Sequence, residues 1–213
     1  MIFLAHAITR LRRTPMPSSG TTLCLAAAFA VALGFAAAKP AAAAAIITVE
    51  AERHGDTIDI RASAMLNADA ATAWRVLTDY DRYAEFIPDL RTSRVVARRG
   101  ATVTVEQSGD AALWLFKMPL DITFEINEIA PDTLQSRAVA GSLHALASSY
   151  TLTPVASGVR LDYAGHIAPG FAFFGELEQM AVRQNVARQF QALADEIESR
   201  GAAIRGHDAA GAR

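Results

Sequence analysis

Residues 68–88 read ADAATAWRVLTDYDRYAEFIP and carry two short helical patterns between β-like runs. Asp69 is a predicted N-cap, because its carboxylate can accept the free backbone N–H groups of a first helical turn. Apolar residues at helical spacing then predict a helix of about two and a half turns that ends near Thr78; they are Ala70, Ala73, Trp74 and Leu77. Asp79-Tyr80-Asp81 interrupts this pattern, and a second short helix containing Tyr83 and Phe86 is expected to stop at Pro88.

The flanking residues predict antiparallel strands. In Thr57–Leu66 an apolar residue alternates with a polar one at nearly every step, so one face of this strand is expected to be buried. Pro119 is expected to break the pattern. Two β-like runs, Thr48–Arg53 and Thr57–Leu66, precede the helical stretch. Those that follow it are Thr92–Ala97, Ala101–Gln107, Ala111–Met118, Asp121–Ile129, Leu134–Ala140, Ser148–Pro154 and Val159–Ile167. A strongly curved meander of about seven strands is expected.

A long amphipathic helix is predicted over Glu176–Ser199, about 36 Å in length, which is enough to cross a whole sheet. Residues 201–213 are small and polar and are expected to form a flexible tail. The predicted buried stripe consists of Leu177, Met180, Ala181, Gln184, Ala187, Phe190, Leu193, Ala194 and Ile197.

This order of elements resembles the START-like (SRPBCC) superfamily, whose α+β helix-grip fold wraps a curved antiparallel sheet around the last helix. Residues 71–90, ATAWRVLTDYDRYAEFIPDL, are similar to the W-x-x-L-x-D-x-x-x-[YW]-x-x-[FW]-x-P pattern of the polyketide cyclase/dehydrase and coenzyme Q-binding branch. The matching positions are Trp74, Leu77, Asp79, Tyr83, Phe86 and Pro88, and the resemblance covers about 57–200. It implies a protein that binds a hydrophobic molecule, as lipid carriers, quinone-binding proteins and aromatase/cyclases do.

The N-terminal residues 1–45 are typical of a secretory signal peptide. Arg10, Arg12 and Arg13 precede an uncharged apolar run at 21–38, and alanines up to Ala45 offer several cleavage sites. A periplasmic or secreted domain at 46–200 is therefore expected. The alternative is an uncleaved anchor in the inner membrane, since the run approaches the length that spans a bilayer. The only cysteine, Cys24, lies inside this segment.

Charge and cysteine content exclude several classes of function. Four of the 20 basic residues but none of the 22 acidic residues precede Ala45, so the remaining 168 residues have a net charge of −6. Without a basic patch, nucleic-acid binding is not expected. A cleaved chain has no thiol for nucleophilic or metal chemistry. We expect no cofactor and no metal site.

A ligand cavity is predicted between the sheet and the C-terminal helix. Small residues at inward-facing strand positions, Ala62, Ala64, Ala138 and Ala140, leave volume that larger side chains would fill, although alanine is also used where neighbours pack closely. The candidate ligand-binding residues are Ala62, Ala64, Trp74, Tyr83, Phe86, Phe116, Phe124, Ala138, Tyr150, Tyr163, Phe171, Phe174, Met180 and Gln184. Burial of a ligand's hydrocarbon contributes about 25 cal/mol per Å².

Several candidate residues allow two interpretations. Trp74 either caps the pocket or belongs to the core, and Gln184 either contacts ligand or is bonded elsewhere. Asp79 and Asp81 either pair as acid and base or cap the second helix. His144 and His166 are too isolated for a metal site, but either could donate a hydrogen bond to a ligand carbonyl.

The aromatic loop APGFAFFG at 168–175 is the remaining ambiguous motif. Phe171, Phe173 and Phe174 either form a lid with transient membrane contact or are tucked into the core. The favoured function is carriage or sequestration of a lipid, quinone or polyketide-type molecule. The alternatives are an aromatase/cyclase-like enzyme, which would need several polar, titratable residues in the cavity, and a protein-interaction module that uses the apolar loop.

Overall fold

The computed structural model describes residues 45–113, 116–143, 145–168 and 176–211, with the backbone alone at 111–113, 116–118 and 176–178. All of these residues belong to one compact unit. In chain order the elements are β1 (Ile46–His54), β2 (Thr57–Leu66), α1 (Ala70–Leu77), the 3₁₀ helix η1 (Tyr80–Arg82), α2 (Tyr83–Phe86), β3 (Leu90–Arg99), β4 (Thr102–Leu113), β5 (Phe116–Ile129), β6 (Thr133–Gly141), β7 (Ala145–Val155), β8 (Gly158–Ala168) and α3 (Glu176–Gly211).

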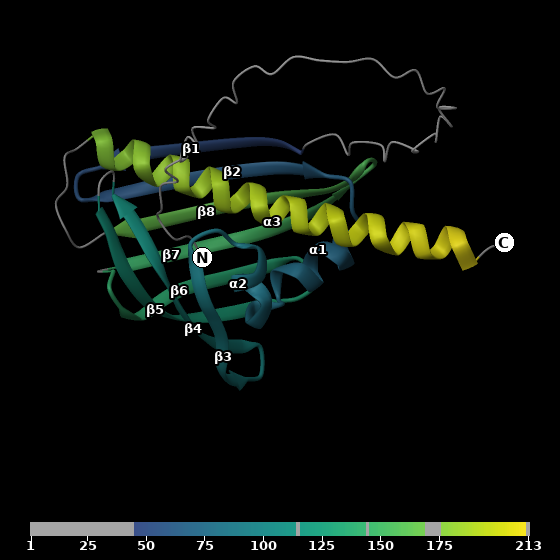
Figure 1. Ribbon diagram of the computed structural model, residues 1–213, viewed down its shortest axis with the longest axis horizontal. Coiled ribbons are helices and arrows are strands. Elements are labelled where there is room, and N and C mark those ends of the chain that lie inside the picture. Colours follow the sequence, from purple (N-terminus) through teal and green to yellow (C-terminus); the bar gives the residue numbers. More distant parts are fainter. Residues whose placement is uncertain (1–44, 114–115, 144, 169–175, 212–213) are drawn as a thin grey trace, which may run out of the picture. The chain divides into compact units, whose positions relative to one another are not determined.

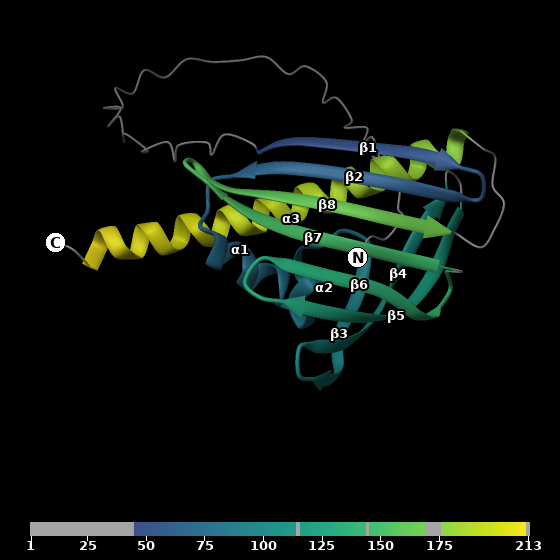
Figure 2. The same cartoon turned by 180° about the vertical axis from the view of Figure 1, so that it is seen from behind.

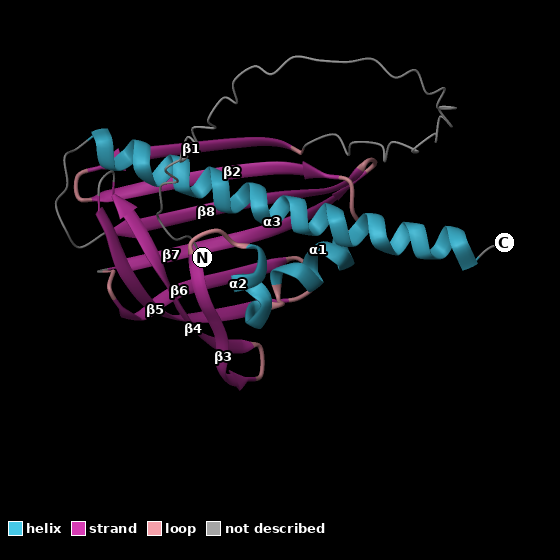
Figure 3. Cartoon of the chain, viewed as in Figure 1, coloured by secondary structure: helices cyan, strands magenta, loops and turns pink. Residues whose placement is uncertain are grey.

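The strands form one antiparallel sheet of eight strands in the order β1-β2-β8-β7-β6-β5-β4-β3. Figure 1 shows α3 passing in front of the sheet, and Figure 2 shows the opposite, uncovered face. All helices lie on the same side of the sheet (Figure 3). The α+β helix-grip architecture predicted from the sequence is therefore confirmed, with eight strands in place of about seven.

The predicted strand break at Pro119 is wrong. Pro119 lies inside β5 and is aligned with Asp110 of β4. The pairing of β5 with β6 begins only at Ile122, so Pro119 lies in a stretch of β5 with one unpaired edge. Proline is tolerated there because no neighbouring strand needs its missing N–H group. The two runs on either side of Gly109 likewise merge into the single strand β4.

The helical stretch after β2 forms largely as predicted. Asp69 is the N-cap of α1, with its carboxylate 2.8 Å from the Thr72 backbone nitrogen, and α2 ends two residues before Pro88. Asp79 occupies the N-cap position of η1, but its carboxylate makes no capping hydrogen bond and contacts Arg200 of α3 at 2.8 Å. The Asp81 carboxylate accepts the Val95 backbone N–H at 2.7 Å, and the N-cap residue of α2 is Arg82. Both aspartates therefore tie the helices to other elements.

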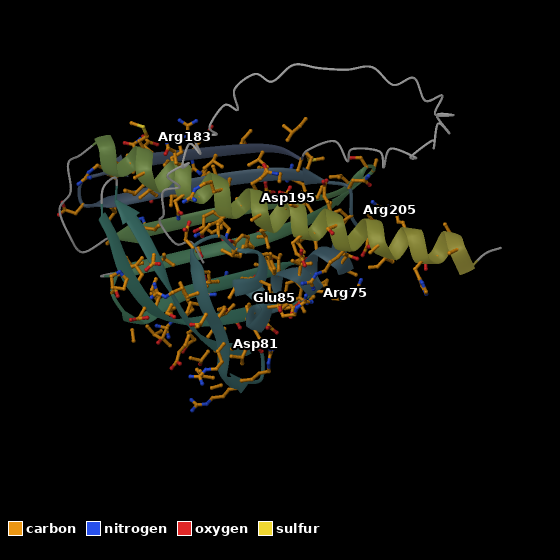
Figure 4. All side chains as sticks on the ribbon, viewed as in Figure 1. Arg75, Asp81, Glu85, Arg183, Asp195 and Arg205 are labelled. Carbon is orange, nitrogen blue, oxygen red and sulfur yellow. The ribbon has the colours of Figure 1, made fainter. Side chains whose placement is uncertain are left out.

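The predicted end of the last helix near Ser199 is also wrong, because α3 continues to Gly211. Gly201 packs closely on Ala68, and Arg205 donates to the Asn67 carbonyl oxygen at 2.9 Å. Beyond these contacts α3 extends past the sheet (Figure 1). Its outer face is marked by the exposed charged residues Arg183, Asp195 and Arg205 (Figure 4).

The hypothesis of an N-terminal signal peptide or anchor concerns residues outside the described ranges. Among the residues that the structure describes, no helix is sufficiently long and apolar to cross a membrane.

Candidate ligand-binding site

The inner face of the sheet, which α1, α2 and α3 cover, carries the predicted large residues. Phe124 on β5 and Tyr163 on β8 are buried, whereas Tyr150 on β7 is only partly buried. The side chains on either side of Tyr150 on the same face, Ser148 and Leu152, are both buried. Tyr150 therefore packs against the core and is the partly accessible side chain between two buried neighbours on β7.

Three of the predicted tyrosines, Tyr83, Tyr150 and Tyr163, come together at this position. The ring centres of Tyr150 and Tyr163 are 4.8 Å apart, and Tyr83 reaches the same region from α2. Burial raises the pKa of Tyr150, and the neighbouring Tyr163 and Tyr83 raise it further. Burial also raises the pKa values of Tyr83 and Tyr163. All three phenols therefore keep their protons at neutral pH and can donate hydrogen bonds.

Trp74 and Phe86 lie at the margin of this region. Both are partly buried and pack against the core, and the Phe86 ring meets the Tyr83 ring edge-on at 5.5 Å between centres. Trp74 therefore contributes to the core from α1, which is one of the helices that cover the inner face.

The alanines predicted to leave cavity volume do not all do so. Ala62 and Ala64 are fully buried on β2, over which α3 packs. A small side chain there lets the helix approach the sheet closely, so these alanines do not by themselves indicate a hollow. Ala138 does lie inward, opposite Phe124, and is partly buried.

Ala140, expected to face inward, is exposed on the outer face. A register shift between Thr123 and Phe124 pairs Phe124 with Ala138 but Thr123 with Ala140. Such a bulge inserts one residue into β6 and exchanges the faces of the residues beyond it.

The predicted inward positions of Met180 and Gln184 on α3 are wrong. Met180 is 50% exposed, and Gln184 is exposed as well. From Phe190 onward the predicted stripe is confirmed, since Leu193, Ala194 and Ile197 are buried, but before Phe190 the buried residues are Val182, Asn185, Val186 and Gln189. The difference is therefore confined to the first half of α3, where the expected stripe followed Met180 and Gln184 and the fold leaves both in solvent.

Sequence reasoning missed most of the buried polar residues of the inner face. Gln107 on β4 is 2% exposed and donates to the Ser93 hydroxyl at 2.9 Å. The Ser136 and Ser148 hydroxyls, on β6 and β7, are 2.7 Å apart. The period of two would have placed Gln107 with Val103 and Val105, and Ser148 with Leu146 and Leu152.

Other candidates face elsewhere or cannot be placed. His166 is exposed on the outer face, where its Nδ1 atom lies 2.6 Å from the Asp59 carboxylate, so it does not reach an inner ligand. His144, Phe171, Phe173 and Phe174 and the side chain of Phe116 lie outside the described part of the chain.

Four hollows formed by described residues lie away from the inner face. One of about 590 Å³ lies between β1 and the start of α3, lined in part by Ala51, Met180 and Arg183. The others lie on the outer face of the sheet and are lined mainly by polar residues. The first hollow has a mixed lining of apolar and polar residues, and all four are open to solvent, so they do not provide the enclosure that a hydrophobic ligand requires.

A curved antiparallel sheet wrapped around a long C-terminal helix, with two short helices after its second strand, is the helix-grip fold of the START-like superfamily. Residues 57–200 match the model of the family described as polyketide cyclase/dehydrase and lipid transport. The chain therefore belongs to that family. No curated protein matches the chain.

Solved structures agree with this fold assignment. The chain is similar to a STAR-related lipid transfer protein from Xanthomonas axonopodis, with a TM-score of 0.61 and 21% identity over 71% of this chain and 93% of that one. It is also similar to the protein TTHA0849 from Thermus thermophilus, with a TM-score of 0.58 and 17% identity over 68% and 98% of the two chains. The di-domain ARO/CYC StfQ from the steffimycin biosynthetic pathway gives a TM-score of 0.59 and 11% identity over 70% and 52%.

Proposed function

We propose that this protein binds a lipid or another hydrophobic small molecule between the inner face of the sheet and α3, and that it carries or sequesters that molecule. The accessibility of Tyr150 at the centre of the inner face is the observation that carries the proposal. Family membership supports it as well. Apolar walls from Phe124 and the tyrosines supply the contact area, at about 25 cal/mol per Å² of hydrocarbon buried.

The second candidate is an aromatase/cyclase-like enzyme. The grouping of Tyr83, Tyr150 and Tyr163 favours it, because phenols can act as proton donors. Acid–base catalysis also requires a group that accepts a proton near neutral pH. Among the described residues, the buried polar side chains are hydroxyls and amides: Thr72, Ser93, Gln107, Ser148, Asn185 and Gln189. This neutral set favours binding over catalysis.

We also propose that the protein acts outside the cytoplasm, either free in the periplasm or anchored to the inner membrane. The basic and apolar character of residues 10–38 supports this location. Transient membrane contact through Phe171, Phe173 and Phe174 is part of this proposal.

Native mass spectrometry of protein purified from its own compartment tests both proposals in one measurement. We expect a co-purifying apolar molecule, which organic extraction would identify, and an intact mass that states whether residues 1–45 have been removed. A protein that is empty and that also takes up no added lipid would contradict the binding function and favour a protein-interaction module.

Substitution of Ala138 by Phe should block the site. Ala138 is inward and partly buried, so a phenyl ring there would occupy the space beside Phe124, and ligand binding should be lost with the fold retained. Val139→Phe is the matched control, since Val139 is adjacent but 46% exposed. Ala64→Phe is a poorer choice, because overpacking a fully buried position costs about 1–3 kcal/mol. Unchanged binding by Ala138→Phe would contradict the placement of the site.

A further inference from the structure

The Tyr163 hydroxyl is a buried polar group that the fold leaves without a partner. Tyr163 is 2% exposed, and its oxygen has no hydrogen-bond partner. Ser148 is close enough to lower the pKa of Tyr163, against the larger upward effect of burial, but the geometry is not that of a hydrogen bond. Buried hydroxyls are nearly always hydrogen-bonded, so an unpartnered one needs an explanation.

Gly165 provides the space that this hydroxyl occupies. An ideal Cβ atom at Gly165 would lie 2.4 Å from the Tyr163 oxygen. The Tyr163 ring therefore leans along β8 over the glycine, and any side chain at position 165 would displace it. The fold thus makes room for an oxygen that the folded chain does not itself use.

Two serines continue from this point across the neighbouring strands. Gly165 is aligned with Ser148 on β7, and Ser148 with Ser136 on β6. Ser148 is buried and Ser136 partly buried, with their oxygens 2.7 Å apart. We call Ser136, Ser148 and Tyr163 the hydroxyl row.

The hydroxyl row has hydrogen-bond donors to spare. Each hydroxyl carries one hydrogen, and the contact between the serines uses one of the three. Two O–H donors remain, one on a serine and one on Tyr163. Burial raises the pKa of Tyr163, so its hydroxyl keeps the proton that it would donate. Two unused donors on one wall suit an acceptor oxygen.

The surroundings select a neutral acceptor. The buried polar side chains of the described residues include no lysine, arginine or histidine. A carboxylate placed at the hydroxyl row would therefore be buried without a counter-charge, which is costly. A ketone, quinone or ester carbonyl can accept both hydrogen bonds without that cost.

We propose that the hydroxyl row is the polar recognition point of the ligand-binding site and that it binds the carbonyl oxygen of a neutral, otherwise apolar molecule. This inference rests on the proposed binding function. It adds a preference for a ligand class and names the atoms responsible for that preference.

The test compares a methyl ketone, a fatty acid and an alkane of equal chain length, each supplied from the same cyclodextrin carrier and titrated by calorimetry. The wild-type protein should bind the ketone most tightly. Tyr163→Phe, which removes only the oxygen, should weaken ketone binding roughly three- to tenfold, as expected for one hydrogen bond, and leave alkane binding unchanged. Ser148→Ala should act in the same direction, and Ser149→Ala is the matched control, since Ser149 is the next residue on β7 and is aligned with exposed Ala164 on the opposite face of the sheet.

The outcomes separate this inference from the function on which it rests. Failure of the folded wild-type protein to bind any of the three probes would overturn the binding function and the inference with it. Tight binding of all three probes, unaffected by Tyr163→Phe and Ser148→Ala, would overturn the hydroxyl row alone. Preferential binding of the fatty acid would overturn the choice of a neutral carbonyl.

Discussion

Two buried tyrosine hydroxyls, those of Tyr83 on α2 and Tyr163 on β8, differ in what they contribute to stability. The Tyr83 hydroxyl donates to the carbonyl oxygen of Leu77, the last residue of α1. Carbonyl groups at a helix end have no partner within the helix, so this bond replaces a missing one. The Tyr163 hydroxyl has no partner and stabilises nothing in the ligand-free protein.

Tyr83→Phe should therefore lower the free energy of unfolding by about 1 kcal/mol, and Tyr163→Phe should leave it unchanged or raise it. Urea unfolding of the two ligand-free variants, followed by circular dichroism, measures the difference. Equal losses for both would show that Tyr163 has a hydrogen bond in the folded state, and this would remove the basis of the hydroxyl row.

At the residue scale, local chemistry was predictable and long-range partners were not. The capping role of Asp69 follows from its own sequence neighbourhood and was predicted correctly. The contacts of Asp79 with Arg200 and of Asp81 with Val95 depend on elements far along the chain, and no local pattern indicates them. The same holds for Tyr163, because only the sheet register brings Gly165 and Ser148 to its oxygen.

At the scale of elements, α3 illustrates how a helix can be predicted and the first half of its buried face missed. Its apolar residues recur at helical spacing on more than one face, so sequence alone allowed two stripes. The stripe through Val186 and Phe190 is buried because it meets the sheet and α1, whereas Met180 remains in solvent.

Phe190→Ala should cost about 3–5 kcal/mol of stability, since it empties a fully packed position. Met180→Ala should change stability by less than about 0.5 kcal/mol, as expected for an exposed side chain away from special contacts. Chemical denaturation of the two variants side by side measures both. Comparable losses would place Met180 in the core together with Phe190, as the sequence pattern predicts.

Strand boundaries depended on pairing in the same way. Thr57–Leu66 was predicted to the residue because it alternates cleanly and ends at turn residues. Pro119 was misassigned because a proline is acceptable in a strand whose second edge is unpaired, and the extent of pairing is a property of the sheet. The bulge at Phe124 turned Ala140 outward for a similar reason.

At the scale of the whole molecule, all four tyrosines of the chain are buried or partly buried in the same unit. Burial is the largest cause that raises the pKa values of Tyr80, Tyr83, Tyr150 and Tyr163 above 10.0. Above that pH the unfolded chain has lost these protons while the folded chain retains them. Stability is therefore at its full value below pH 10.0 and falls as the pH rises further.

An alkaline titration should show tyrosinate absorbance appearing together with the loss of the circular dichroism signal, in one cooperative step. The folded protein should give little absorbance change near pH 10.0, the ordinary pKa of tyrosine. A tyrosine that ionises near pH 10.0 in the folded state must have its hydroxyl open to solvent. Tyr150 is the first candidate, because it is only partly buried whereas the other three tyrosines are buried. If the variant Tyr150→Phe lacks this absorbance change, Tyr150 is the tyrosine that ionises.

The class of fold was predictable because the order of elements and the 71–90 motif are local properties that the family shares. The lining of the inner face was predictable only in part. Its large aromatic residues stand out in the sequence, whereas its serines and amides are indistinguishable from surface residues until the register is known. A neutral polar wall also provides no charged motif for sequence reasoning to detect.

The strand order determines the sequence in which parts of the sheet can fold. From β3 to β8 each strand pairs with the one that follows it, so these hairpins can form while the chain is still being made. The seam between β2 and β8 aligns Ile58 with Ile167, and it must wait for the C-terminal part of the chain, as must α3. Contacts between such distant residues slow folding. The inner face is thus enclosed at the last step, and under the proposed function a ligand can bind only after that step. A bound molecule would then delay unfolding, while the early hairpins would form at the same rate with or without it.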